Sequence, residues 1–411
     1  MRADAAATGG WPSRLAASWA RHRTALLTTG LVLTALVMVP RWTHELGRLL
    51  VEEGPQGARD LAMRHWEVGR WFAGGAADGP LAPKIYPPAS YAILWPFLGW
   101  LDLAAARWLW AATLLAALAW LTAIVVRESG AESRLARAFL VAWVPAMYAT
   151  TVTVGNGQLG VHVLAAVLTS ILIARRGRGA WPSDLAAALL FTLSLVKPSL
   201  AAPFFWILLT GRGGARRGAL VVAAYAALTA LAVSFRPEGM LGLLRSWLSI
   251  SRETAVGARY GYMNLHEWMS AAGLEEWIPY GSLLVLALLG AWVLRHRGGP
   301  VWPALGAAAI VARTWTYHAL YDDLLLLVPI VALVRAAREA PPGEGRAVAT
   351  GLVVCAGWFS TLVPARLLTA PPPWDLAFRA GQTAVWVAVL VALLALASRP
   401  APGFGGAAGR T

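Results

Sequence analysis

Long apolar runs separated by short polar connections fill most of this 411-residue chain. A helix rises 1.5 Å per residue, so about 20 apolar residues cross a bilayer. The pattern predicts an all-α polytopic membrane protein with about twelve membrane-spanning helices. We place the spans at residues 24–39, 106–126, 138–154, 158–174, 182–196, 199–210, 218–235, 281–294, 301–313, 324–337, 347–363 and 381–398.

Composition excludes a water-soluble domain, because 58% of the residues are hydrophobic and only 14% are charged. Too little polar surface remains to cover such a chain in water. The net charge of +14 does not indicate a nucleic-acid partner, because in a polytopic protein basic residues first report orientation. They are concentrated in loops on one side of the predicted spans, at residues 1–23, 127–137, 175–178, 212–217, 295–297 and 335–346.

This asymmetry predicts that both termini lie in the cytoplasm. Residues 1–23 then form a cytoplasmic tail, residues 24–398 the transmembrane domain, and residues 399–411, rich in Ala, Gly and Pro, a disordered cytoplasmic tail. Two long segments, 41–105 and 236–280, are expected on the extracytoplasmic side.

The first of these segments is unusually acidic. Six of the 21 acidic residues lie between Arg41 and Pro88. Within it, Gly57–Gly74 has apolar residues at helical spacing opposite a polar face, which predicts an amphipathic helix along the membrane surface. Tyr91–Leu101 follows, is interrupted by Pro96 and is too short to span, so we expect a re-entrant or interfacial segment.

The spans 182–196 and 199–210 are also short for a bilayer. Their junction, Lys197-Pro198, is therefore expected below the outer surface, beneath a cavity. Other polar residues gather at the outer ends of the spans: Asp60, the turn Gly155-Asn156-Gly157-Gln158, Asn264, Arg313 and His318. A polar group on one membrane face suits a site that takes lipid from one side and a polar acceptor from the other.

An ordered set of motifs carries a family resemblance. The set comprises an early loop acid, Tyr86-Pro87-Pro88, Gly-Asn-Gly-Gln at 155–158, Leu195-Val196-Lys197-Pro198, Asn264 and Tyr317-His318. This order resembles glycosyltransferase family 87. The resemblance implies a GT-C-like membrane enzyme of the cell (plasma) membrane. Such an enzyme transfers mannose, or in some members arabinofuranose, from a polyprenyl-phosphate donor to a lipid-linked or cell-envelope glycan on the extracytoplasmic side, with inversion.

The chemistry of that transfer assigns roles to the candidate residues. A sugar phosphate already carries a good leaving group, so one carboxylate suffices as general base, and we assign it to Asp60. Cations stabilise the departing phosphate, which suggests donor phosphate-binding roles for Lys197, His318 and Arg313. The substrate-binding candidates are Tyr86, Asn156, Gln158 and Asn264. No spacing resembles a metal site, so we expect no cofactor and a metal-independent reaction.

Structural readings compete with these assignments. Asp60 at i, i+4 from Arg64 suits a simple ion pair, Lys197 suits snorkelling to the interface, and Asp322 and Asp323 suit a helix cap. Asn156 and Gln158 suit a tight turn, the sequence 315–321 suits an aromatic belt, and Asp78 and Glu67 remain alternative bases. At the level of function, the alternatives are a transporter or flippase of a lipid-linked saccharide, which would favour two similar halves, and a non-catalytic assembly subunit.

Overall fold

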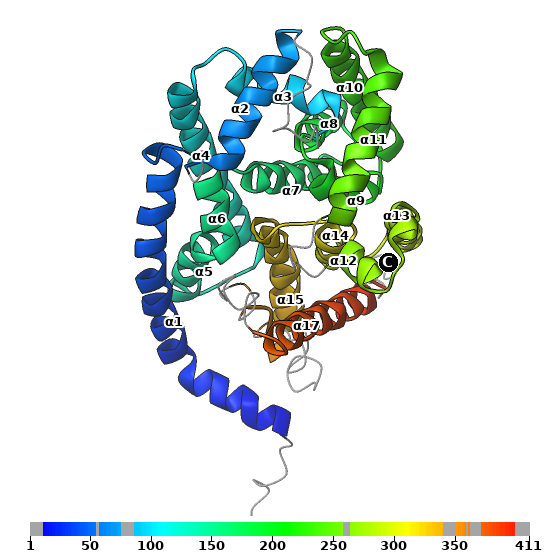
Figure 1. Cartoon of the computed structure of the whole chain (residues 1–411). Coiled ribbons are helices and arrows are strands. Elements are labelled where there is room, and N and C mark those ends of the chain that lie inside the picture. The colour runs from blue at the N-terminus through cyan, green and yellow to red at the C-terminus, as the bar shows by residue number, and fades with distance from the viewer. Residues whose placement is uncertain are drawn as a thin grey trace, which may run out of the picture.

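The computed structural model describes residues 11–54, 57–74, 86–257, 264–339, 351–352, 354, 356–358, 361 and 371–398. Every regular element in these ranges is a helix, and none of the described residues forms a strand. The all-α prediction is therefore confirmed (Figure 1).

The N-terminal half contains α1 (Trp11–Leu50), α2 (Arg59–Phe72), α3 (Pro88–Leu98), α4 (Leu103–Glu128), α5 (Arg134–Ala146), α6 (Tyr148–Asn156), α7 (Gly160–Arg176), α8 (Trp181–Ser194) and α9 (Pro198–Leu208). The remainder contains α10 (Gly214–Val233), α11 (Gly239–Gly257), α12 (Leu265–Ala271), η1 (Glu275–Trp277), α13 (Ile278–Arg295), α14 (Val301–Thr314), η2 (Leu320–Leu326), α15 (Leu327–Glu339) and α17 (Trp374–Ala397). In Figure 1, α1 runs along one flank, and α2 and α3 lie at one end beside α8 and α10.

Membrane-crossing helices are present, although fewer qualify than the twelve that the hydrophobic pattern predicts. Five described helices are long and apolar enough to cross a bilayer: Arg21–Leu50, Leu103–Glu128, Gly214–Val233, Glu275–Arg295 and Trp374–Ala397. Adding the bent pair α5 and α6 gives up to six. The chain is a polytopic membrane protein, and the predicted span 347–363 lies largely outside the described residues.

The predicted span at 138–154 is broken into two helices. α5 and α6 meet at Met147 with a bend of 45°. Pro145 near the end of α5 cannot donate a helical hydrogen bond, and Met147 adopts an extended backbone with φ −53° and ψ 135°. The Thr150 hydroxyl donates to the Val144 carbonyl at 2.8 Å, which satisfies one carbonyl at the break.

The short pair of helices before and after Lys197 is confirmed. α8 has 14 residues and α9 has 11. Lys197 precedes α9 with non-helical angles of φ −129° and ψ 83°, and Pro198 opens the helix at the position where a proline is tolerated. The tip between the two helices therefore presents Lys197 at a fixed break.

The amphipathic helix predicted within Gly57–Gly74 is present as α2, but its polar side does not face water. Leu61 and Val68 are fully buried, and Arg64 and Glu67 are also buried. Trp71 near the end of α2 stacks on a tyrosine of α3 with ring centroids 4.2 Å apart. Part of the polar side of α2 thus packs against protein, which places Arg64 and Glu67 in the interior, whereas Arg59 and Arg70 stay exposed.

A buried ion cluster joins α8 to α10. The Asp184 side chain is fully buried and accepts from Arg217 Nη1 at 2.7 Å, and it also pairs with Arg216. The Arg217 guanidinium donates further to the carbonyls of Leu208, Thr210 and Arg212. These bonds occupy the guanidinium and satisfy carbonyls at the end of α9.

Replacing Asp184 by Asn should destabilise the protein by on the order of 3 kcal/mol, because it leaves a buried guanidinium without its counter-charge. Thermal unfolding of the detergent-solubilised protein measures the effect as a lowered melting temperature. Glu132→Ala is the matched control, because its pair with Arg338 leaves Glu132 88% exposed. Equal melting temperatures for the two variants would contradict the role of Asp184.

Candidate active site

The turn Gly155-Asn156-Gly157-Gln158 brings α6 against both α1 and α2. Gly157 ends α6 with φ +66°, in the left-handed region that glycine adopts at little cost. A Cβ on Gly157 would lie 2.5 Å from the Leu61 Cβ, so the two backbones approach closely. On the other side, a Cβ on Gly155 would meet the Glu45 carboxylate of α1. Both glycines are therefore required by close approach.

The polar residues of the same turn connect α1 to α2. Arg48 Nη2 donates to Asn156 Oδ1 at 2.7 Å, and Arg48 also pairs with Glu45 at 2.8 Å. Gln158 Nε2 donates to Asp60 Oδ2 at 2.6 Å. Asn156 thus anchors the turn, while Gln158 contacts the candidate base directly.

The ion pair expected between Asp60 and Arg64 is not formed. Arg64 Nη1 instead bonds the Glu67 carboxylate, and its guanidinium lies over the Tyr86 ring, 4.4 Å from the centroid. Asp60 is half-buried and, among the described residues, has Gln158 as its hydrogen-bond partner. This geometry leaves Asp60 Oδ1 without a donor in the described part of the chain.

Lys197, His318 and Asp322 form a buried triad. Lys197 Nζ donates to Asp322 Oδ1 at 2.7 Å, and His318 Nδ1 lies 3.1 Å from Asp322 Oδ2. The Ala319 amide also donates to Oδ2 at 3.3 Å. Burial alone would raise the pKa of Asp322, but Lys197 and His318 hold it well below its usual range. Asp322 is therefore a permanent anion between a lysine and a histidine.

The side chains of His318 and Arg313 are both covered by protein. The His318 side chain has no exposed surface, and its Nε2 lies 3.2 Å from the Thr316 hydroxyl. Arg313 Nε donates to Asp323 Oδ1 at 2.6 Å. Burial and the positive charges of Lys197 and Arg313 lower the pKa of His318, against the pull of Asp322.

These groups converge on the buried Tyr86. Burial raises the pKa of Tyr86, and four charged groups act on it: Lys197, Arg64, Asp60 and Asp322. Burial lowers the pKa of Lys197, but Asp322, Tyr86 and Asp60 together raise it above its usual value. Lys197 also lies 4.9 Å from the centroid of the Tyr321 ring. We call Asp60, Arg64, Tyr86, Lys197 and Asp322 the Tyr86 cluster.

Two members of the cluster were missed as site residues in the sequence. Asp322 suggested a helix cap, and it does accept from the Ala319 amide, but it also bonds Lys197 and His318. Arg64 suggested only a partner for Asp60. Its spacing of one helical turn from Asp60 was the signal that both project from the same side of α2.

Other candidates are placed elsewhere or lie outside the described residues. Asn264 is buried, and its Oδ1 caps α12 by accepting from the Glu267 amide at 3.1 Å. Asn264 takes part in none of the contacts described above for the Tyr86 cluster. Glu67, an alternative base, is bonded to Arg64, and Asp78, the other alternative, lies outside the described residues.

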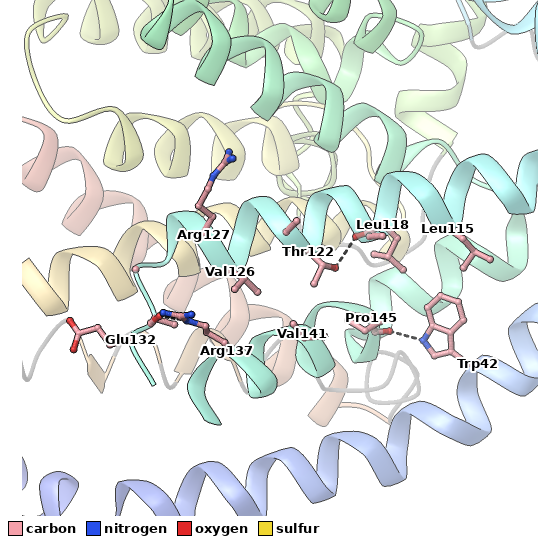
Figure 2. Close-up of a pocket in the computed structure, with 14 residues that line it drawn as sticks. Trp42, Leu115, Leu118, Thr122, Val126, Arg127, Glu132, Arg137, Val141 and Pro145 are labelled. Carbon is pink, nitrogen blue, oxygen red and sulfur yellow. Dashed lines mark hydrogen bonds between the residues drawn. The ribbon is translucent and has the colours of Figure 1, made fainter. Parts of the chain in front are cut away.

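A groove of about 920 Å³ lies away from the cluster, between α1, α4 and α5. Leu115, Leu118 and Val141 contribute to its mainly apolar wall, and Figure 2 shows Trp42 of α1 donating to the Pro145 carbonyl across one end of it. No predicted site residue lines this groove. The chemistry-bearing residues and this groove are therefore in different places.

Comparison with protein families supports the resemblance seen in the motifs. The model of glycosyltransferase family 87 matches residues 85–259. This segment belongs to glycosyltransferase family 87. It includes Tyr86, the turn at 155–158 and Lys197. Neither a curated protein nor a solved structure matches the chain. The family indicates a membrane glycosyltransferase, which acts on a sugar donor and an acceptor.

Some transferase sites hold a metal ion, which requires a cluster of ligating side chains. Within the described residues, no group of three or more His, Cys, Asp and Glu side chains is placed to hold a metal ion. The carboxylates of the Tyr86 cluster are instead bonded to Gln158, Lys197 and His318.

Replacing Gly157 by Ala should lower transferase activity at least about tenfold. The left-handed backbone costs a side chain about 1 kcal/mol, and the new methyl would displace Leu61 and with it Asp60. Activity and melting temperature are measured together. The matched control is Gly69→Ala in α2, where a Cβ meets nothing within 4 Å and helix propensity favours alanine. Full activity in Gly157→Ala would contradict the close approach.

Proposed function

We propose that this family 87 glycosyltransferase transfers a sugar from a polyprenyl-phosphate donor to a lipid-linked or cell-envelope glycan. Mannose is the first candidate sugar and arabinofuranose the second. The proposal places the enzyme in the plasma membrane, with both termini cytoplasmic and the Tyr86 cluster on the extracytoplasmic side. The observation that supports it is the electrostatic interaction of Asp60 and Lys197 with each other and with Tyr86, in a chain whose residues 85–259 match the family.

In the proposed reaction, Asp60 is the general base. Its Oδ2 is held by Gln158 at 2.6 Å, and Oδ1 takes the proton of the acceptor hydroxyl as that oxygen attacks the anomeric carbon. The new glycosidic bond forms as the bond from the anomeric carbon to the phosphate oxygen breaks, and polyprenyl phosphate leaves. Attack opposite the leaving group inverts the anomeric centre. One carboxylate suffices because the phosphate needs no protonation to depart.

The cationic side of the cluster would stabilise the departing phosphate. Lys197 supplies a charge at the tip between α8 and α9, and Asp322 fixes its position. The buried side chains of His318 and Arg313 would add hydrogen-bond donors, and the Arg313 guanidinium would add positive charge. Fixed charges in a site that excludes water are worth more than in solution.

Replacing Asp60 by Asn should reduce transfer about 10²- to 10⁴-fold, the usual contribution of a general base. The fold should survive, because the Asn carbonyl still accepts from Gln158. Transfer is measured with reconstituted protein and radiolabelled polyprenyl-phosphate mannose or arabinofuranose. Asp102→Asn is the matched control, because Asp102 caps α4 by accepting from the Ala105 amide at 2.7 Å and Asn caps equally well. Undiminished turnover in Asp60→Asn would move the base elsewhere.

We also propose that transfer needs no divalent metal. The leaving group is a monophosphate, and the side chains of Lys197 and Arg313 supply the positive charge that a metal supplies to diphosphates. Transfer should therefore continue in excess chelator at its initial rate. Activity that disappears with the chelator and returns with a divalent cation would refute metal independence.

A further inference from the structure

Arg64 is a buried guanidinium whose hydrogen-bonding capacity is largely unused. It is 7% exposed, and among the described residues its one hydrogen bond goes from Nη1 to Glu67. Arginine carries five N–H donors in a rigid fork. The scaffold residue Arg217, by contrast, bonds one carboxylate and three carbonyls. Arg64 therefore keeps donors that a further anion can occupy.

Both cations of the Tyr86 cluster are paired with a carboxylate, but the two pairs differ. Lys197 is paired with Asp322 at 2.7 Å, and Asp322 is held further by His318 and the Ala319 amide. Asp60 has no salt bridge among the described residues. Arg64 is paired with Glu67, which has no second salt bridge among the described residues, and it lies 4.4 Å from the centroid of the Tyr86 ring.

We propose that Arg64 binds the phosphate group of the polyprenyl-phosphate lipid, and that Glu67 is the internal anion that occupies Arg64 when the site is empty. This inference rests on the proposed function and assigns its phosphate site to a residue of α2. The guanidinium lies 4.4 Å from the centroid of the Tyr86 ring, and Tyr86 interacts electrostatically with Asp60 and Lys197. The geometry suits a bidentate contact with two phosphate oxygens.

The protonation state of Glu67 is consistent with this exchange. Burial raises the pKa of Glu67 to about 7, against the opposing effects of Arg64 on its own helix and Tyr91 on α3. A phosphate beside Arg64 adds negative charge near Glu67 and raises that pKa further. Lipid binding therefore takes up a proton at Glu67, and affinity falls as the pH rises through about 7. Glu67→Gln removes both the competitor and this pH dependence.

The test is a binding measurement that needs no sugar transfer. Polyprenyl phosphate is titrated into the full-length protein in nanodiscs of zwitterionic lipid, and the dissociation constant is compared among variants. Arg64→Ala should weaken binding at least about tenfold, as expected for a lost charged hydrogen bond, and Arg64→Lys should fall between it and wild type. Arg59→Ala, an exposed arginine of the same helix, is the matched control and should bind normally.

Glu67→Gln is the second variant, which keeps the proposal testable if Arg64→Ala fails to fold. Glu67→Gln should bind polyprenyl phosphate more tightly than wild type at pH 8.5, and the difference in affinity should be smaller at pH 6.5. Titration of the phosphate itself affects both proteins equally, so it does not contribute to this difference. Wild-type affinity in Arg64→Ala, or weaker binding by Glu67→Gln at pH 8.5, would overturn the assignment. Failure of every protein, wild type included, to bind polyprenyl phosphate would instead refute the proposed donor class, and with it the role of Arg64.

Discussion

A single buried carboxylate, that of Asp322, determines how the candidate site is assembled. In a low-dielectric interior a charge must be paired and hydrogen-bonded, and Asp322 meets this requirement with Lys197, His318 and the Ala319 amide. These partners come from the tip between α8 and α9 and from the segment before η2. The ion pair therefore fixes the cationic side of the site relative to the helices that carry it.

Charged residues elsewhere in the fold show what a purely structural cluster looks like. Asp184 and Arg217 use their hydrogen-bonding groups on each other and on backbone carbonyls. Glu128 likewise accepts from Arg176 at 2.6 Å and from the Trp302 indole at 3.3 Å, joining α4, α7 and α14. Saturated clusters of this kind hold helices together. Arg64 and Asp60 differ, because each retains a polar group that the described residues leave without a partner.

Much of this arrangement was predictable from the sequence, and the reasons for the failures are physical. The amphipathic period predicted α2, and the Lys197-Pro198 break was visible in the lengths of the two apolar runs. The bend at Met147 was missed because residues 138–154 are mostly apolar, so hydropathy does not report a break that Pro145 causes. The count of twelve spans stays a prediction, because many apolar helices in the described part of the chain are shorter than a bilayer crossing.

The hydrogen-bond and salt-bridge partners of the site residues were harder to predict than the positions of these residues on the helices. Sequence spacing placed Asp60 and Arg64 on one side of α2, yet Arg64 is bonded to Glu67, and Asp60 is bonded to Gln158, which lies 98 residues away. Long-range partners of this kind depend on helix packing, which local patterns do not encode. The turn at 155–158 illustrates the point. Its glycines indicate a turn in the sequence, but their second role, the close approach of this turn to α1 and to α2, is seen only in the fold.

The most direct test of the central claim is an experimental structure with a polyprenyl-phosphate sugar bound. The account predicts the phosphate between Arg64 and Lys197, and the anomeric carbon facing Asp60 Oδ1 with space for an acceptor hydroxyl between them. A donor bound with its phosphate remote from both cations, for example in the groove between α1, α4 and α5, would contradict the account.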